Sequence, residues 1–311
     1  MNFAVIGTGA VGGYYGGLIC RHGFETHFLL HSDFEHVRDN GLRIDSRDGG
    51  FRLEKVNAYQ RAEDLPRCDV VLVSLKTTAN DLLPDILPHV IKPGGIVIAL
   101  QNGFTTEKAI HDIVPDAIVI GGLCFLCSNK IGPGHIRHLD FGSVRLGEYR
   151  ADGSPAGLTP ALEAVAEAFR SAGIKVDVTD NLARARWQKL VWNMAFNGVT
   201  VVLSATTDQL MADPSALELV RGIMKEVVAG ARACGQSLQD NFIDQMIAAT
   251  QEMVAYSPSM KLDFEAGRPL EIDEIYNRPI DAARLAGVAM PRAETIACQL
   301  AFLDRRNRRT I

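Results

Sequence analysis

A lysine and two asparagines recur at every fourth position of an otherwise apolar segment: Lys189, Asn193 and Asn197. At 3.6 residues per turn, residues four apart drift by about 40° per step, so a helix would place these side chains in one polar stripe. A lysine and two amides are costly to bury without partners. The stripe therefore predicts a site for polar groups. The alternative is a partly solvated face with one asparagine bonded to a neighbouring helix.

Lys189 has the chemistry of a proton donor to a carbonyl oxygen. Hydride addition to a ketone places negative charge on that oxygen, and an ammonium group both stabilises this charge and protonates it. A nearby carboxylate would keep the lysine charged. Glu271, in the run Leu270-Glu271-Ile272-Asp273, is the candidate carboxylate, and the alternative reading is an acid at the start of a helix.

The other chemical pattern is a glycine-rich turn that follows an apolar run at the N-terminus. Its residues are Gly7, Thr8, Gly9, Ala10, Val11 and Gly12. After a strand and before a helix, the first glycine makes a tight turn, the second lets a pyrophosphate approach the backbone, and the third lets helix and strand pack closely. The helix start then holds phosphates through free N–H groups and its dipole. A merely tight turn and an FAD site are the rival readings.

The residues after the second expected strand favour NADP(H) over NAD(H). An NAD-preferring site normally has Asp or Glu at this point to bind the ribose 2′-hydroxyl. Here the strand His27–Leu30 is followed by His31 and Ser32, with Asp33 close behind. Two donors and no carboxylate at the strand end suit a 2′-phosphate. His31 as a solvated loop residue is the alternative.

Two further polar residues follow expected strands. Lys76 comes after Asp69–Leu75, and Asn102 comes after Ile96–Leu100. Ligands of open α/β sheets bind outside the carboxyl ends of the strands. We therefore expect both residues in the site, with surface positions as the alternative.

The elements that must position these residues alternate between strands and helices in the first half of the chain. This pattern predicts a mainly parallel, doubly wound Rossmann-like α/β sheet. The expected strands are Phe3–Ile6, His27–Leu30, Asp69–Leu75, Ile96–Leu100, Ala117–Leu126 and Ile174–Val178. Gly134–Asp140 and Ser143–Tyr149 are predicted to form an edge hairpin that turns at Phe141 and Gly142.

Helix ends are marked by local signals. Ser32 and Glu35 predict a capping box for a short helix that stops at Asn40 and Gly41, while Thr159 and Pro160 predict a helix N-cap and first position. After Asp180 the pattern becomes wholly helical, with expected helices at 181–203, 214–234, 239–256, 272–286 and 292–306. Residues 1–179 are therefore predicted to be an NADP-binding domain, and residues 180–311 an all-helical substrate and catalytic domain that closes over the nicotinamide.

Composition excludes several classes of protein. The chain has 32 Lys and Arg against 37 Asp and Glu, with no long basic run, so neither nucleic acid nor an anionic membrane is an expected partner. The apolar N-terminus lacks a preceding Lys or Arg and is broken by glycines, so it predicts neither a signal peptide nor a membrane span. Six scattered cysteines suit thiols in a cytoplasmic protein. The Cys124 and Cys127 pair lacks a second pair for a zinc site, so no metal is expected.

Taken together, these motifs resemble the ketopantoate reductase (2-dehydropantoate 2-reductase) family from Met1 to about residue 290. The similarity is carried, in order along the chain, by the glycine turn, Ser-Leu-Lys at 74–76, Gln-Asn-Gly at 101–103, Trp-Gln-Lys-Leu-Val-Trp-Asn-Met-Ala-Phe-Asn at 187–197, Ser-Met at 259–260 and Glu-Ile-Asp at 271–273. Two positions depart from the family pattern: His31 stands where an arginine is common, and Pro258 where a small residue is common.

The resemblance implies NADPH-dependent reduction of 2-dehydropantoate to (R)-pantoate, a step of pantothenate biosynthesis on the coenzyme A pathway. It implies that Lys189 is the general acid, that Asn193, Asn197 and Ser259 contact the substrate, that Asn102 touches substrate and cofactor, that Lys76 lines the cofactor side, and that Glu271 orients the reacting groups or the cofactor ribose. A homodimer is a possible assembly of the apolar helical domain. The rival functions are a reductase of another branched keto acid and a non-catalytic NADP-binding sensor.

Overall fold

The computed structural model describes residues 1–253 and 257–309. The chain forms two compact units. The first comprises Met1–Asn102 and Thr106–Leu182, and the second comprises Gly103–Thr105 and Ala183–Ile311. The short segment 103–105 therefore belongs to the second unit, although it lies within the sequence of the first.

The described part of the first unit is built on one ten-stranded sheet in the order β4-β3-β9-β8-β7-β6-β1-β2-β5, with β10 paired to β9. Its strands are β1 (Phe3–Ile6), β2 (Thr26–Leu29), β3 (Leu42–Ser46), β4 (Phe51–Leu53), β5 (Asn57–Tyr59), β6 (Cys68–Val73), β7 (Ile91–Ala99), β8 (Ile118–Gly132), β9 (His135–Glu148) and β10 (Val176–Val178). Strands β7, β6, β1 and β2 are neighbours and parallel, so their carboxyl ends lie along one edge of the sheet.

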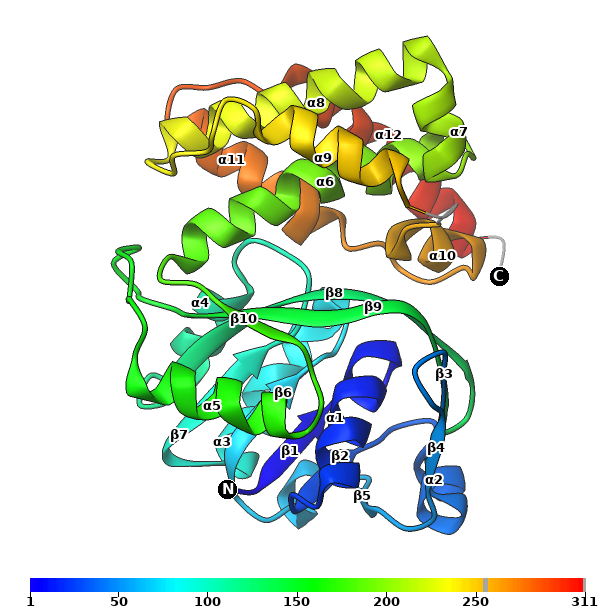
Figure 1. The fold of residues 1–311 in the computed structure, drawn as a ribbon, viewed down its shortest axis with the longest axis vertical. Helices are drawn as coiled ribbons and strands as arrows, with labels where there is room; N and C mark the ends of the chain where they lie inside the picture. Colours follow the sequence, from blue (N-terminus) through cyan, green and yellow to red (C-terminus); the bar gives the residue numbers. More distant parts are fainter. Residues whose placement is uncertain (254–256, 310–311) are drawn as a thin grey trace. The chain divides into compact units, whose positions relative to one another are not determined.

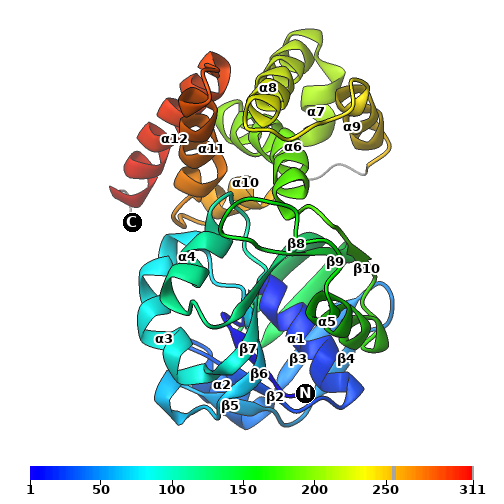
Figure 2. The same cartoon turned by 90° about the vertical axis from the view of Figure 1, so that its left-hand side faces the viewer.

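Helices cover both faces of this sheet (Figure 2). They are α1 (Ala10–His22), α2 (Phe34–Asn40), α3 (Leu83–Val90), α4 (Thr106–Ile113) and α5 (Pro160–Ser171), with short 3₁₀ turns η1 (Ala62–Asp64) and η2 (Thr77–Leu82). Phe3 and Val5 of β1 share a buried cluster with α1 and α5, whereas Ala4 and Ile6 share one with α3 and α4. Burial on both faces explains why β1 is apolar throughout and does not alternate.

The predicted Rossmann-like fold class is confirmed, and so is the cap that begins α5. Thr159 Oγ1 accepts a hydrogen bond of 3.2 Å from the Leu162 N–H, and Pro160 is the first helical residue. Gly173, with φ of 82°, lies just beyond the helix end, where the left-handed conformation favours glycine.

The predicted edge hairpin is wrong. Residues 135–148 form one continuous strand, β9, which lies between β3 and β8. Leu126 pairs with Phe141 and Phe125 with Ser143, so Gly142 is an extra, unpaired residue. The positive φ angles of Phe141 and Gly142 therefore make a β-bulge, which bends the strand without reversing it. The chain reverses instead at Pro133 and Gly134, because Gly132 pairs with His135.

The predicted capping box is also wrong. Asp33, not Ser32, is the N-cap of α2, and its side chain makes no cap hydrogen bond because it is held elsewhere. The helix does stop at Gly41, whose N–H donates to the Val37 carbonyl. Strands β3, β4 and β5 were not predicted, since they have only three to five residues and each mixes apolar with polar side chains.

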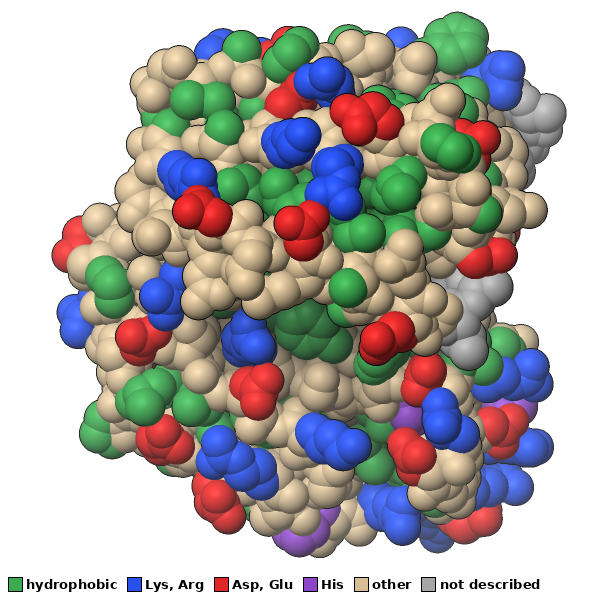
Figure 3. All heavy atoms as spheres, turned by 45° about the horizontal axis from the view of Figure 1, so that its top comes forward, with side chains coloured by type: hydrophobic (Ala, Val, Ile, Leu, Met, Phe, Trp, Pro, Cys, Tyr) green, Lys and Arg blue, Asp and Glu red, His purple; other side chains and the backbone are tan. Residues whose placement is uncertain are grey.

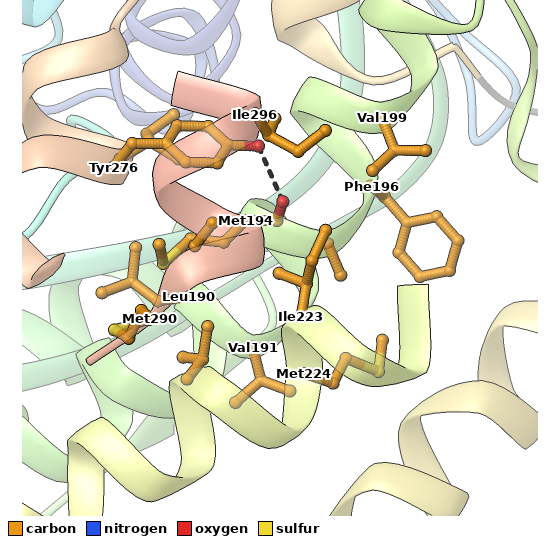
Figure 4. Packing of buried hydrophobic residues seen from close by; sticks show 14 of the residues in the cluster. Leu190, Val191, Met194, Phe196, Val199, Ile223, Met224, Tyr276, Met290 and Ile296 are labelled. Carbon is orange, nitrogen blue, oxygen red and sulfur yellow. Dashed lines mark hydrogen bonds between the residues drawn. The ribbon is translucent and has the colours of Figure 1, made fainter. Parts of the chain in front are cut away.

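The described part of the second unit is helical. Its elements are α6 (Leu182–Val202), α7 (Thr207–Ala212), α8 (Pro214–Ala233), α9 (Phe242–Gln251), α10 (Ser259–Glu265), the π-helical turn η3 (Asp273–Asn277), α11 (Arg278–Leu285) and α12 (Pro291–Arg309) (Figure 1). Helix α6 is the centre of this unit, because its apolar residues pack against α8, η3 and α12 (Figure 4).

Two short helices, α7 and α10, were not predicted, and the expected helix 272–286 is divided into η3 and α11. Residues 254–256 of the expected helix 239–256 lie outside the described residues. Within the described ranges, no helix combines the length and apolarity that a membrane crossing needs. Basic and acidic side chains are interspersed over the face drawn in Figure 3.

Candidate active site

The predicted cofactor residues of the first unit lie at the carboxyl ends of neighbouring strands. Gly7 follows β1, and His31 follows β2 after one intervening residue. Lys76 lies shortly after β6, and Asn102 shortly after β7. Because these four strands are adjacent and parallel, the structure brings the four positions to one edge of the sheet, as a dinucleotide site requires.

The glycine turn is packed too closely for side chains at two positions. Gly7 has φ of 92°, and a Cβ there would lie 2.7 Å from the Leu75 N–H nitrogen. A Cβ on Gly12 would lie 2.1 Å from Ser74 Oγ and 2.3 Å from the Gly7 carbonyl oxygen. Ser74 donates to that carbonyl at 2.7 Å. Ser74 belongs to the Ser-Leu-Lys motif at 74–76, and the sequence alone predicted no role for it. The structure shows that it fixes the shape of the glycine turn.

The start of α1 suits a phosphate. Gly9 is its N-cap and supplies no capping side chain, and no acidic residue lies in the first turn. A Cβ on Gly9 would meet nothing within 4 Å, so the backbone faces open space at this point. The neighbouring Thr8 is buried, and its hydroxyl donates to the Leu29 carbonyl at 3.4 Å. The free N–H groups and the helix dipole at this end attract an anion, so the residues present fit the pyrophosphate of a dinucleotide.

The acidic residue after β2 is not available to a ribose. Asp33 is only 6% exposed, and Lys130 Nζ lies 2.6 Å from its Oδ2. The Gly134 N–H donates to the same oxygen at 2.9 Å. Burial acts to raise the pKa of Asp33, but the hydrogen bonds from Lys130 and Gly134 outweigh it and hold the pKa below its ordinary value. His31 and Ser32 are exposed.

Gln101 joins the segment after β7 to the segment after β6 by hydrogen bonds. Its side chain is buried, and Nε2 donates to the Leu75 carbonyl at 2.9 Å and to Asn80 Oδ1 at 2.6 Å. These bonds determine where the next residue, Asn102, begins its loop.

The segment that follows Asn102 is held by Glu274. One carboxylate oxygen accepts from the backbone N–H groups of Phe104 and Thr105 at 2.9 and 2.8 Å, and the other accepts from the Thr105 hydroxyl at 2.6 Å. Phe104 also packs edge-on against Trp187, with ring centroids 4.9 Å apart. These contacts explain why 103–105 belongs to the second unit. Sequence reasoning missed Glu274, since its partners are about 170 residues away.

The predicted polar stripe exists on α6. Asn193 is 7% exposed and Asn197 is 2% exposed, while Lys189 is half-buried. No hydrogen bond joins either amide to a residue within 1–253 and 257–309, and neither amide is among the fully buried side-chain polar atoms that lack a partner in these ranges, so the two amides reach accessible space. Two asparagines of low exposure on one stripe, whose amides are open to a ligand and not used within the unit, indicate a place where a polar ligand binds.

Tyr276 holds the turn of α6 that runs from Met194 to Gly198 and carries Asn197. Its fully buried hydroxyl donates to the Met194 carbonyl at 2.7 Å and accepts from the Gly198 N–H at 2.8 Å (Figure 4). An uninterrupted α-helix pairs this carbonyl and this N–H with each other. A Cβ on Gly198 would lie 2.2 Å from the Tyr276 hydroxyl oxygen, so glycine is needed there. Burial raises the pKa of Tyr276 strongly, and it stays a neutral hydroxyl.

Glu271 and Ser259 come from other elements of the second unit. Glu271 is 5% exposed and immediately precedes the turn of helix that leads into η3, from which the Tyr276 hydroxyl bonds to the backbone of α6. Ser259 is half-buried and begins α10. The roles of both residues at a substrate stay predictions.

Comparison with known proteins agrees with this geometry. The family model described as ketopantoate reductase PanE/ApbA matches residues 3–151, and the model of the C-terminal part of ketopantoate reductase PanE/ApbA matches residues 181–304. The chain belongs to the ketopantoate reductase family. A 2-dehydropantoate 2-reductase of Nostoc sp. is 47% identical over 307 residues, which are 99% of this chain and 96% of that protein.

Solved structures of the family have the same fold. The 2-dehydropantoate 2-reductase from Geobacter metallireducens is 40% identical, with a TM-score of 0.92 over 97% of this chain and 99% of that one. The enzyme of the same name from Methylococcus capsulatus is 33% identical, with a TM-score of 0.89 over 99% of this chain and 98% of that one.

For this ketopantoate reductase family member, we predict that Gly12→Ala weakens NADPH binding by about 10- to 100-fold. Overpacking of this kind costs about 1–3 kcal/mol, and here the added methyl group must displace Ser74 and the Gly7 carbonyl, which shape the turn. Titration of nicotinamide fluorescence measures the affinity. Gly132→Ala is the control, because the nearest atom to its Cβ is 3.9 Å away. Equal NADPH affinity in both variants would contradict the prediction.

We also predict that Tyr276→Phe lowers the free energy of unfolding by about 1–3 kcal/mol, because two buried backbone groups lose their partner. Denaturant unfolding measures the loss. The matched control is Tyr15→Phe in the first unit, since the Tyr15 hydroxyl is equally buried but bonds to one backbone group, the Ser143 carbonyl at 3.1 Å, and to the side chain of Cys124. A loss no greater than that of the control would show that the Tyr276 bridge does not stabilise α6.

Proposed function

We propose that this protein catalyses the reduction of 2-dehydropantoate to (R)-pantoate with NADPH. The observation that carries the proposal is the pair of amides of Asn193 and Asn197, to which no described residue bonds, on the same helix face as Lys189 in a chain of this family. A 2-keto acid with a hydroxyl group offers a carboxylate, a carbonyl and an alcohol. Amides and an ammonium group are the hydrogen-bonding partners that such a molecule needs.

NADPH supplies a hydride to the carbonyl carbon when it is bound. The Lys189 ammonium stabilises the negative charge that grows on the carbonyl oxygen and donates a proton to it. Asn193 and Asn197 hold the polar groups of the substrate, and Ser259 adds a hydroxyl contact. Glu271, buried directly before the helical turn that carries Tyr276, favours the charged form of the lysine and orients the reacting groups.

The residues of the first unit are assigned to the cofactor. The turn from Gly7 to Gly12 holds the pyrophosphate, Lys76 and Asn102 line the nicotinamide side, and His31 lies at the adenosine ribose. NADPH is favoured because Asp33, the acid that would bind a free ribose diol, is already engaged by Lys130 and Gly134.

The remaining assignments follow from this activity. Residues 1–179 bind NADPH and residues 180–311 bind the substrate and supply the acid, so the reaction requires both to act on one substrate molecule. The product enters pantothenate and coenzyme A synthesis. We expect the enzyme in the cytoplasm, as a homodimer.

The experiment that tests the substrate follows NADPH oxidation with ketopantoate, pyruvate and 2-ketoisovalerate side by side. We expect the highest kcat/KM with ketopantoate, because it alone of the three has a hydroxyl group for the second amide. A higher kcat/KM with 2-ketoisovalerate would favour the other candidate function, reduction of a different branched keto acid. NADPH binding without turnover on any of the three would favour a non-catalytic sensor.

We predict that Lys189→Ala lowers kcat by about 10²- to 10⁴-fold, the usual effect of removing a positioned acid. NADPH affinity and unfolding temperature should stay close to wild type, because the lysine is half-buried and not part of the apolar core. Lys225→Ala, an exposed lysine on α8, is the control for loss of a positive charge in the same unit. A kcat within a few-fold of wild type would remove Lys189 from the mechanism.

We further predict that wild type uses NADPH better than NADH, and that His31→Asp erodes or reverses this preference. The new carboxylate would repel a 2′-phosphate and offer an acceptor to a ribose hydroxyl. The ratio of kcat/KM for the two cofactors is the measurement. His36→Asp, at an exposed position of α2, controls for added negative charge nearby. A wild-type enzyme that prefers NADH would overturn this assignment.

A further inference from the structure

Asp33 and Lys130 form an ion pair between segments that are far apart in the sequence. Asp33 is buried at the start of α2, just after the strand whose end binds the ribose in dinucleotide sites. Lys130 lies near the end of β8, and its Nζ is 2.6 Å from Asp33 Oδ2. The Gly134 N–H and the Ser32 hydroxyl complete the set of donors to this carboxylate. An acid at this position would ordinarily select NAD(H), and here its charge is neutralised.

The long pair of strands β8 and β9 carries Lys130 to this place. Strand β8 pairs with β7 only from Ile118 to Gly121, and beyond that point it continues with β9 alone (Figure 1). The extension passes the first turns of α1, since the Ser128 hydroxyl donates to the Ala10 carbonyl at 3.4 Å. Ile136 of β9 packs against Gly13 of α1, since a Cβ on Gly13 would lie 2.8 Å from Ile136 Cδ1. The β8–β9 extension therefore contacts the start of α1, which follows the glycine turn, and its Lys130 contacts Asp33 just after β2.

The Lys130 ammonium has hydrogen-bonding capacity left after the ion pair. An ammonium group has three N–H donors, and Asp33 Oδ2 accepts one of them. The Lys130 side chain keeps 32% of its surface exposed, whereas the Asp33 side chain keeps 7%. The positive end of the pair is thus the one that solvent or a ligand reaches. Next to it, His31 and Ser32 are exposed.

We propose that Lys130 determines the preference for NADPH over NADH. It neutralises Asp33, so that no free carboxylate repels the 2′-phosphate, and it supplies the cation that this phosphate contacts. This inference rests on the proposed use of NADPH.

The test measures the dissociation constants of NADPH and NADH by direct fluorescence titration of Lys130→Met, with no keto acid present. We expect the NADPH-to-NADH affinity ratio to fall by about 10- to 100-fold, the effect of losing a hydrogen bond to a charged group and uncovering an acid. Lys130→Arg should retain the wild-type ratio, because the positive charge stays. Asp33→Asn with Lys130→Met should recover part of the ratio lost in Lys130→Met, because no acid is left uncovered.

The matched control is Lys92→Met. Lys92 Nζ lies 2.6 Å from Asp69 Oδ1 in the same unit, so this variant breaks an ion pair of the same length and type at the start of β6, which is the opposite end of the parallel strands. The NADPH-to-NADH affinity ratio of Lys92→Met should equal that of wild type. Thermal unfolding of each variant shows whether it is folded at the titration temperature, and Lys130→Gln replaces Lys130→Met if the latter is not.

The outcomes separate the inference from the proposed function. A Lys130→Met or Lys130→Gln ratio within about twofold of wild type overturns the role of Lys130 while leaving the use of NADPH intact. A wild type that binds neither nucleotide overturns both. The same ratio change in Lys92→Met would show a general effect of lost charge and would also overturn the proposal.

Discussion

The site depends on one constraint: a polar side chain that leaves water must find a partner. Three such partnerships join segments that are distant in the sequence. Asp33 is held by Lys130, Glu274 holds the backbone at Thr105, and Tyr276 bridges two backbone groups of α6. Each contact fixes a segment that carries a proposed functional residue, so the same pairing that makes burial possible also positions the chemistry.

The cofactor side uses the opposite arrangement, in which backbone N–H groups are left without a capping side chain. Gly9 at the start of α1 offers no side chain and faces open space. Ser74 packs closely under the turn and excludes a side chain at Gly12. The turn is therefore rigid on its inner side and open on its outer side, which is what an anion held by a helix terminus needs.

Helix α6 shows the difference between a structural and a functional polar group. The Tyr276 hydroxyl is fully buried and makes two hydrogen bonds, so its polar capacity is used inside the unit. Asn193 and Asn197 lie beside the residues it contacts, and within the described ranges their amides bond to nothing. Because neither amide is among the fully buried atoms without a partner in these ranges, both remain open to a ligand that can bond to them. We regard this contrast as the clearest physical sign of a substrate site on α6.

The sequence by itself determined the features that depend on neighbouring residues. These are the strand and glycine turn at the N-terminus, the Thr159 cap, the helical second half and the stripe on α6, because local periodicity and capping rules act over a few residues. It misplaced the turn at Phe141 and Gly142, since only the pairing of β8 with β9 distinguishes a bulge from a reversal. It left the role of Asp33 open and did not predict Glu274 or Tyr276 as positioning residues. Those roles were decided by tertiary structure alone, because each depends on a hydrogen bond or ion pair to a residue at least 80 positions away, and neither composition nor spacing records such a partner.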